Sequence, residues 1–239
     1  MVSVLRIHDL AQIPEHLRSR GIDFPRPVIV IVGGAGSLDN AELRRLEPLF
    51  TEGLAPLAES LDAAIVDGGT DAGVMRLIGQ AHDAVCASFP LIGVAPAEKV
   101  SAPGDSPLPG HTQLESHHSM VMIVPASSWI EGSTWLSAVA GVLSKGEPSV
   151  TVVIGGGNVT WFDAAESVRS GRPVVAVGGT GHVADALSAA VHDDAANEQA
   201  ATIQASGLLF AVDLDAGSSA VTAAIRRAFD LARSSIGTS

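Results

Sequence analysis

The chain has 239 residues, of which 46% are hydrophobic and 17% charged, a composition that excludes a disordered protein. Its formal net charge is −12, which argues against the phosphate backbone of a nucleic acid as a partner. One cysteine, Cys86, cannot build a disulfide framework or a cysteine-based zinc site, and we expect it to pack in the core. No apolar run approaches the roughly 18 residues of a membrane span and the first residues lack the order of a signal peptide, so we expect a cytoplasmic protein without membrane contact.

Short apolar runs rich in valine and isoleucine alternate with helical patterns, which predicts βαβ units and a mostly parallel sheet. The runs are apolar throughout, as is typical of strands buried on both faces. They lie at residues 27–37, 61–75, 90–96, 119–125, 149–157, 172–181 and 207–214. We expect residues 1–26 to form an N-terminal extension with an edge strand and a short helix. Residues 27–239 are expected to form one Rossmann-like α/β domain with helices on both faces of the sheet.

The first helical pattern covers residues 43–61, and Asp39 with Glu42 has the spacing of a capping box at its start. Two prolines and a glycine inside this pattern predict a kink or a break. Thr160 is expected to cap the helix that follows the third glycine-rich loop. The acidic segment 192–199 is expected to be a solvated loop. The other expected helices lie at residues 74–85, 133–145, 160–170, 183–191 and 221–232.

Four glycine-rich loops each join the end of a predicted strand to the start of a helix, at residues 33–37, 68–73, 155–160 and 178–181. Glycine allows positive φ and close approach of the backbone to a ligand, and the helix that follows offers unpaired N–H groups. All such loops lie at one edge of a parallel sheet, which predicts a site for a phosphate or a ribose. An incomplete G-x-G-x-x-G disfavours an NAD dehydrogenase, and no G-x-x-x-x-G-K-[ST] is present for a P-loop NTPase.

Other residues near these loops are candidates for the same site. The segment 101–116 is a loop by composition and long enough to cover a site. Trp129, Trp135 and Trp161 could each stack on a base, with Trp135 expected in the core and Trp161 favoured because it directly follows a glycine loop. Three histidines near the long loop, His111, His117 and His118, are interpreted as hydrogen-bonding or ligand-contacting groups. No metal site is expected.

Three motifs in order along the chain resemble the SLOG superfamily, in particular the N-terminal region of melastatin-type TRP channels and its free-standing prokaryotic relatives. Residues 67–79 (DGGTDAGVMRLIG) resemble a GG pair, a three-residue gap and a G-V-[MI] run. Residues 114–125 (LESHHSMVMIVP) place His118 on the histidine of that pattern. Residues 171–187 (GRPVVAVGGTGHVADAL) place Asp185 on its aspartate and His182 where it has arginine. The resemblance implies a nucleotide-binding Rossmann-like fold.

A second resemblance is to the LOG-type phosphoribohydrolases, whose P-G-G-x-G-T-x-x-E motif is similar to residues 155–163 (GGGNVTWFD). Gly156, Gly157 and Thr160 match, and Asp163 stands in the place of the catalytic glutamate. The shorter side chain sets the carboxylate about 1 Å back, a shift that can cost on the order of 100-fold in rate. The resemblance therefore implies nucleotide binding more strongly than hydrolysis. Three residues after the expected cap, Asp163 is also placed to complete a capping box.

We expect a binding or sensor module for a nucleotide-derived, phosphate-bearing ligand such as ADP-ribose or NAD, with no required cofactor. Two alternatives stay open: an enzyme that cleaves a nucleoside monophosphate with Asp163 as its catalytic residue, and an interaction scaffold without a ligand. A homo-oligomer is compatible with each. The residues expected to contact the ligand are Gly33, Gly34, Gly36, Ser37, Gly68, Gly69, Thr70, Gly73, His118, Gly155, Gly156, Gly157, Asn158, Thr160, Gly178, Gly179, Thr180, Gly181, His182 and Asp185.

Overall fold

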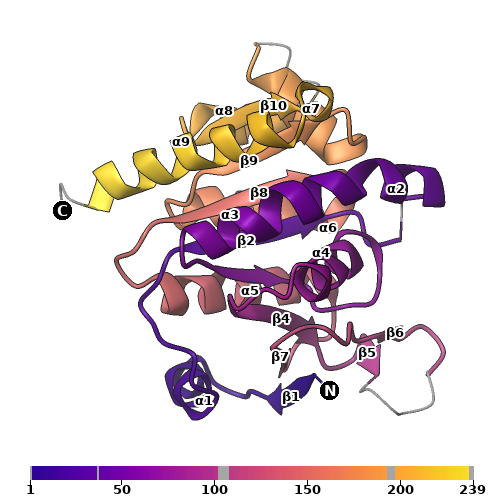
Figure 1. Ribbon diagram of the computed structural model, residues 1–239, viewed down its shortest axis with the longest axis vertical. Coiled ribbons are helices and arrows are strands. Elements are labelled where there is room, and N and C mark those ends of the chain that lie inside the picture. Colours follow the sequence, from indigo (N-terminus) through magenta and orange to yellow (C-terminus); the bar gives the residue numbers. More distant parts are fainter. Residues whose placement is uncertain (1, 37, 102–107, 193–196, 237–239) are drawn as a thin grey trace.

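The computed structural model describes residues 2–36, 38–101, 108–192 and 197–236; Ser37 and residues 102–107 of the long loop lie outside these ranges. Eight parallel strands form one sheet in the order β1-β7-β4-β3-β2-β8-β9-β10 (Figure 1). Their bounds are β1 Ser3–Arg6, β2 Val28–Gly33, β3 Ala64–Asp67, β4 Leu91–Pro96, β7 Met120–Val124, β8 Ser149–Ile154, β9 Val174–Gly178 and β10 Leu209–Asp213. A separate pair joins β5 (Val100–Ser101) to β6 (Thr112–Gln113). The predicted parallel sheet is confirmed.

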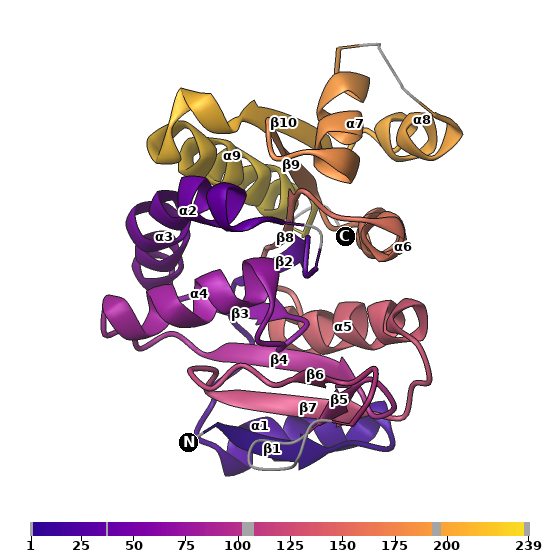
Figure 2. The ribbon, with the colours of Figure 1, turned by 90° about the vertical axis from the view of Figure 1, so that its right-hand side faces the viewer.

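Helices cover both faces of the sheet (Figure 2). One face carries α2 (Asn40–Pro48), α3 (Ala55–Ser60), α4 (Gly73–Ala84) and α9 (Ser218–Ile236). The other carries α1 (Ile13–Ser19), α5 (Trp129–Ser144), α6 (Asn158–Arg169), α7 (His182–Ala190) and α8 (Glu198–Ala205). Strand β2 contributes Ile29 and Ile31 to the core on the first side, and Val28 and Val30 to the core on the second. Each buried side chain of this size stabilises the fold by about 1.5–3 kcal/mol, which explains why the strand has no polar residues.

The N-terminal extension forms the edge strand and short helix that the sequence predicts. Strand β1 pairs in parallel with β7, with Val4 opposite Val121. Helix α1 buries Ile13 and Leu17 against the second core. The extension therefore continues the main sheet by one strand.

The first helical pattern is interrupted as predicted, by a π-helical segment at Leu49–Leu54 between α2 and α3. Gly53 of this segment packs closely against α9, where an added Cβ would lie 3.3 Å from Cβ of Ser218. The predicted capping box is confirmed, because Asp39 Oδ1 accepts from the backbone N–H of Glu42 at 2.9 Å and Glu42 Oε2 accepts from that of Asp39 at 2.7 Å.

Three local predictions are wrong. Helix α6 begins at Asn158 with Gly157 as its N-cap, so Thr160 lies inside the helix and does not cap it. Helix α8 begins at Glu198, within the segment expected to be a loop, because the side chain of the preceding asparagine caps it. Cys86 is exposed, since it follows the end of α4 in a left-handed turn at φ 50°.

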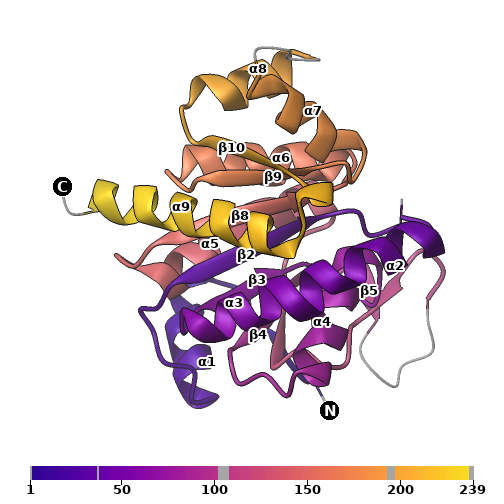
Figure 3. The same ribbon diagram turned by 45° about the horizontal axis from the view of Figure 1, so that its top comes forward.

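The order of the strands reverses between β2 and β8. From β2 the chain builds β3 and β4 on one side, and it later returns to place β8 directly against the other side of β2 (Figure 3). In open parallel sheets, ligands bind in the crevice outside the carboxyl ends of the strands at such a reversal. The fold thus indicates a ligand site outside the carboxyl ends of β2 and β8.

Candidate ligand-binding site

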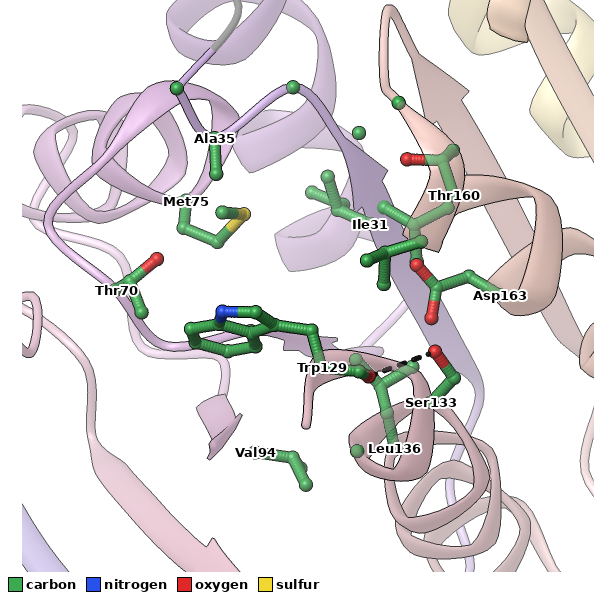
Figure 4. Close-up of a pocket in the computed structure, with 18 of the residues that line it drawn as sticks. Ile31, Ala35, Thr70, Met75, Val94, Trp129, Ser133, Leu136, Thr160 and Asp163 are labelled. Atoms are coloured by element: carbon green, nitrogen blue, oxygen red, sulfur yellow. Dashed lines mark hydrogen bonds between the residues drawn. The ribbon is translucent and has the colours of Figure 1, made fainter. Parts of the chain in front are cut away.

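A cavity of about 330 Å³ opens at the carboxyl ends of β2, β3 and β8, at this reversal. Its volume lies at the lower end of the roughly 300–1,000 Å³ of small-molecule sites. Three of the four glycine-rich loops reach it, together with the first two turns of α5 (Figure 4). The lining residues are Ile31, Val32, Gly33, Gly34, Ala35, Gly36, Gly68, Thr70, Met75, Val94, Thr112, Trp129, Gly132, Ser133, Leu136, Gly157, Asn158, Val159, Thr160 and Asp163.

The first loop is held between β8 and α4. The backbone N–H of Gly34 donates to the carbonyl of Ile154 at 3.0 Å, and the carbonyl of Gly34 accepts from the N–H of Val74 at 3.1 Å. A Cβ on Gly33 would overlap the first of these carbonyls, and one on Gly73 the second. These glycines are therefore required for the packing of the loop, whether or not they also contact a ligand.

The second loop rests on a buried network centred on His118. The ring Nε2–H of His118 donates to Asp67 at 2.9 Å, and Nδ1–H donates to Glu115 at 2.8 Å. Asp67 also accepts from the N–H of Gly69 at 2.7 Å. Burial alone would lower the pKa of His118, but the two carboxylates outweigh it and raise the pKa to about 9. The structure thus gives His118 a supporting position behind the loop, outside the cavity lining.

The third loop is braced by α7. Gly155 and Gly156 have φ of 60° and 98°, values that favour glycine. The N–H of Gly155 donates to the hydroxyl of Thr180 at 2.8 Å, and its carbonyl accepts from Ala184 in the first turn of α7 at 3.0 Å. Helix α6 then begins at Asn158, and its N-cap Gly157 provides no side-chain cap. Its positive amino-terminal end therefore lies at the cavity wall, available to an anion.

The fourth loop lies at the same edge of the sheet but lines a separate hollow of about 220 Å³. Asp185 accepts from the N–H groups of Gly179 at 2.7 Å and Thr180 at 3.2 Å. Arg45 donates to the carbonyl of Gly179 at 2.7 Å. His182 is exposed at the start of α7. The structure therefore brings three of the predicted loops together and assigns the fourth to holding the third in place.

Helix α5 supplies the wall that sequence reasoning missed. The helix begins at Trp129, four residues before the predicted start, because the hydroxyl of Ser128 accepts from the N–H of Glu131 at 3.2 Å. Trp129 and Ser133 then lie one turn apart and both face the cavity. The favoured tryptophan, Trp161, packs instead against the second core. The Ser128-x-x-Glu131 spacing typical of a capping box was the signal for this start.

The cavity has an apolar side and a polar side. The indole of Trp129 extends across it near Met75, with Val94 and Leu136 below (Figure 4). The glycine loops and the start of α6 form the opposite side. An aromatic face of this kind suits stacking with a flat ring, while the backbone N–H groups suit a phosphate.

Asp163 points into the cavity toward Ser133 (Figure 4). It lies six residues after Gly157, the N-cap of α6, so the interpretation of Asp163 as part of a capping box is wrong. Burial raises the pKa of Asp163 to about 7, and the hydroxyl of Ser133 opposes that rise in part. Of the cavity-lining residues that the structure describes, Asp163 alone is ionisable.

The raised pKa predicts that Asp163→Asn stabilises the free protein at high pH. The folded pKa of about 7 exceeds the ordinary aspartate value of 3.8, so the stability linked to the bound proton is lost as the pH rises through 7. We expect the free energy of unfolding of the variant to rise by on the order of 1–3 kcal/mol at pH 8. A shift of one pKa unit corresponds to about 1.4 kcal/mol, and partial exposure of the side chain reduces the effect.

Urea unfolding of both proteins at pH 5 and pH 8 measures this difference. Asp230→Asn, which changes an exposed carboxylate on α9, is the matched control and should leave stability unchanged. A loss of stability in Asp163→Asn at pH 8 would contradict the burial of this carboxylate.

An open parallel sheet with a glycine-lined cavity at its reversal of strand order defines a Rossmann-like protein with a candidate ligand site. The chain belongs to the SLOG family, since the family model described as SLOG in TRPM, prokaryote, matches residues 26–223. The family and the fold class predicted from the sequence are thus confirmed.

Curated relatives are similar to this chain in sequence, and a solved structure shares its fold. The chain is 27% identical over 208 residues to transient receptor potential cation channel subfamily M member 2 of Rattus norvegicus. It is 26% identical over 211 residues to the member-like 2 protein of Nematostella vectensis. These matches cover 70% and 72% of this chain but 13% of each channel protein. The X-ray structure of TM1055 shares the fold, with a TM-score of 0.57 and 20% identity over 84% of this chain and 99% of that one.

Two features are absent from the described ranges. No helix there has the length and apolar character that crossing a membrane requires. Nowhere in the same ranges do three His, Cys, Asp or Glu side chains gather as a metal ion would need.

Proposed function

We propose that the cavity binds a nucleotide-derived, phosphate-bearing ligand of the ADP-ribose or NAD type, and that the chain acts as a binding or sensor module. The observation that carries the proposal is the meeting of three glycine loops, the uncapped start of α6 and the indole of Trp129 around one cavity. The phosphate is assigned to the loops and to the amino-terminal end of α6, and the base to Trp129. Membership of the SLOG family supports a nucleotide-related ligand.

The extent of the matches favours a module over a free-standing catalyst. The relatives of this chain are named as cation channels, and the chain matches a short part of each of them. A domain that recurs within such proteins suits the role of sensing a small molecule and passing that state to a neighbouring part.

Trp129→Ala tests the placement of the base. Stacking of a base on an aromatic side chain contributes about 1–3 kcal/mol by alanine substitution, so we expect affinity for ADP-ribose to fall roughly 5- to 150-fold. Isothermal titration calorimetry with ADP-ribose measures the change. Trp161→Ala removes an indole that packs outside the cavity and should leave affinity unchanged. Equal losses in the two variants would place the base elsewhere.

A second candidate function is favoured by the position of Asp163, a carboxyl group that points into the cavity and whose pKa burial raises to about 7 (Figure 4). A carboxyl group with such a pKa is poised for general acid–base chemistry near neutral pH, as cleavage of a nucleoside monophosphate would need. Incubation with AMP and chromatographic detection of free adenine test this candidate. Release of adenine that is lost in Asp163→Asn would favour the enzyme, and intact AMP in a sample that binds it would favour the binding module.

A further inference from the structure

We propose that the cavity takes up its phosphate-bearing ligand together with one proton, which is held on the carboxyl group of Asp163. The inference rests on the proposed function and names a regulation of the same site. The proton comes from solvent and bonds to a carboxylate oxygen of Asp163 as the ligand enters. No other bond is made or broken.

Ionisable side chains are scarce in the cavity lining. The described residues of its lining include one carboxyl group and no lysine, arginine or histidine. Their polar side chains other than Asp163 are neutral hydroxyl and amide groups, such as those of Thr70, Ser133 and Asn158. Backbone N–H groups and the end of α6 supply only partial positive charge. An anionic ligand therefore meets the Asp163 carboxylate without a cationic side chain on the lining to offset the repulsion.

Charged groups on the elements around Asp163 do not supply that offset either. The strands β2, β8 and β9 carry none. Those on the neighbouring helices are exposed at the surface or paired with other groups. They are Glu131 on α5, Glu166 and Arg169 on α6, His182 and Asp185 on α7, and Glu198 on α8. Glu166 and Arg169 pair with each other, Glu131 accepts from Ser127, and Asp185 accepts from the fourth glycine loop. On α4, Arg76 lies outside the cavity lining and pairs with Asp71 at 2.7 Å.

The pKa of Asp163 in the free protein agrees with this geometry. Burial raises the pKa of Asp163 to about 7, and no charged neighbour contributes to the shift. A phosphate brought into the same cavity raises the pKa further, because the like charge disfavours the ionised form. Above pH 7 the free protein is largely deprotonated at this site, so binding must be accompanied by uptake of a proton. Once protonated, the carboxyl group can donate a hydrogen bond to a phosphate or ribose oxygen.

A different arrangement of the ligand would reverse the direction of proton exchange on binding. If the ionised carboxylate accepted hydrogen bonds from ribose hydroxyls, ligand binding would lower the pKa of Asp163. The complex would then release a proton near pH 7 instead of taking one up. A single measured quantity, the number of protons exchanged on binding, separates the two arrangements.

Calorimetric titration of the full chain with ADP-ribose at pH 8, in two buffers of different ionisation enthalpy, measures that number. ADP-ribose is the probe because its diphosphate stays fully ionised between pH 5 and pH 9. We expect uptake approaching one proton at pH 8 and near zero at pH 5.5. The association constant should fall by up to about tenfold for each pH unit above 7.

Two variants complete the test. Asp163→Asn should bind ADP-ribose at pH 8 without proton uptake and with little dependence on pH. Glu166→Gln, on the same helix but outside the cavity lining, should keep the uptake of the wild-type chain. AMP serves as a second probe above pH 7, where its phosphate, with a second pKa of about 6, is already doubly ionised.

The outcomes separate this inference from the proposed function. Binding at pH 8 with no proton uptake, or with release of a proton, would overturn the inference and leave the proposed function standing. Uptake that persists in Asp163→Asn would also overturn it, because another group would then hold the proton. If neither ADP-ribose nor AMP binds at pH 5.5 or pH 8, the proposed function itself fails and the inference fails with it.

Discussion

Gly157→Val is expected to weaken ligand binding by on the order of 100-fold while the fold stays intact. Gly157 lines the cavity at the start of α6, with φ −117°, a conformation open to any residue. No heavy atom lies within 4 Å of a Cβ added there, so the chain accommodates the new side chain without a clash. It would occupy the space in which we place the phosphate. Loss of two charge-assisted hydrogen bonds, at about 1.5 kcal/mol each or more, corresponds to a fall in affinity on the order of 100-fold.

Calorimetry with ADP-ribose and the far-UV circular dichroism spectrum check the two parts of this expectation. Gly141→Val is the matched control, because Gly141 is an exposed residue of α5 with equally open space around its Cα. Gly69 and Gly156 are poorer probes: both have positive φ, and an added Cβ at Gly69 would lie 2.8 Å from Cα of Gly93. Wild-type affinity in a folded Gly157→Val would move the site away from α6.

His118→Ala is expected to destabilise the fold by about 3–5 kcal/mol, because it leaves the buried carboxylates of Asp67 and Glu115 without their cationic partner. The pKa of His118 is about 9 in the folded chain, above the ordinary histidine value of 6.5. The stability that the charged ring contributes is therefore complete below pH 6.5 and is lost as the pH rises through 9.

Urea unfolding at pH 6 and pH 9.5 should show a large difference between wild type and His118→Ala at the lower pH and a smaller one at the higher pH. His8→Ala, which changes an exposed histidine near the amino terminus, should unfold as wild type. A loss below about 1 kcal/mol at pH 6, the range of an exposed pair, would show that the network is not the buried charged cluster described above.

The strands were predictable because each buried strand corresponds to one short, continuous run of apolar residues. A parallel strand covered by helices on both faces needs apolar residues at every position, and the runs ending near Gly33, Gly68 and Gly155 meet that need. The capping box was predictable because its two members, Asp39 and Glu42, are only three residues apart in the sequence. The start of α6 was not, since Thr160 is a good capping residue by type but Gly157 takes the extended conformation that begins the helix.

The site was predictable only in part because its walls come from distant segments. Asp67 and His118 are 51 residues apart, and only the pairing of β4 between β3 and β7 brings them together. The same holds for Trp129, which reaches the cavity because α5 packs beside α6. A glycine loop taken alone gives no sign of whether a ligand or another helix takes up its backbone groups, which is why the fourth loop looked like the other three.

The central claim is that a nucleotide-type ligand occupies the cavity between β2 and β8, and thermal denaturation at pH 6 tests it most directly. A ligand at about 100 times its Kd adds roughly 2.7 kcal/mol, which for a domain of this size raises the Tm by about 5–10 °C. We expect such a rise with at least one of ADP-ribose, NAD and AMP in the wild-type chain, and a rise of no more than about 2 °C in Gly157→Val. No rise with any of the three at millimolar concentration, or an equal rise in both proteins, would contradict it.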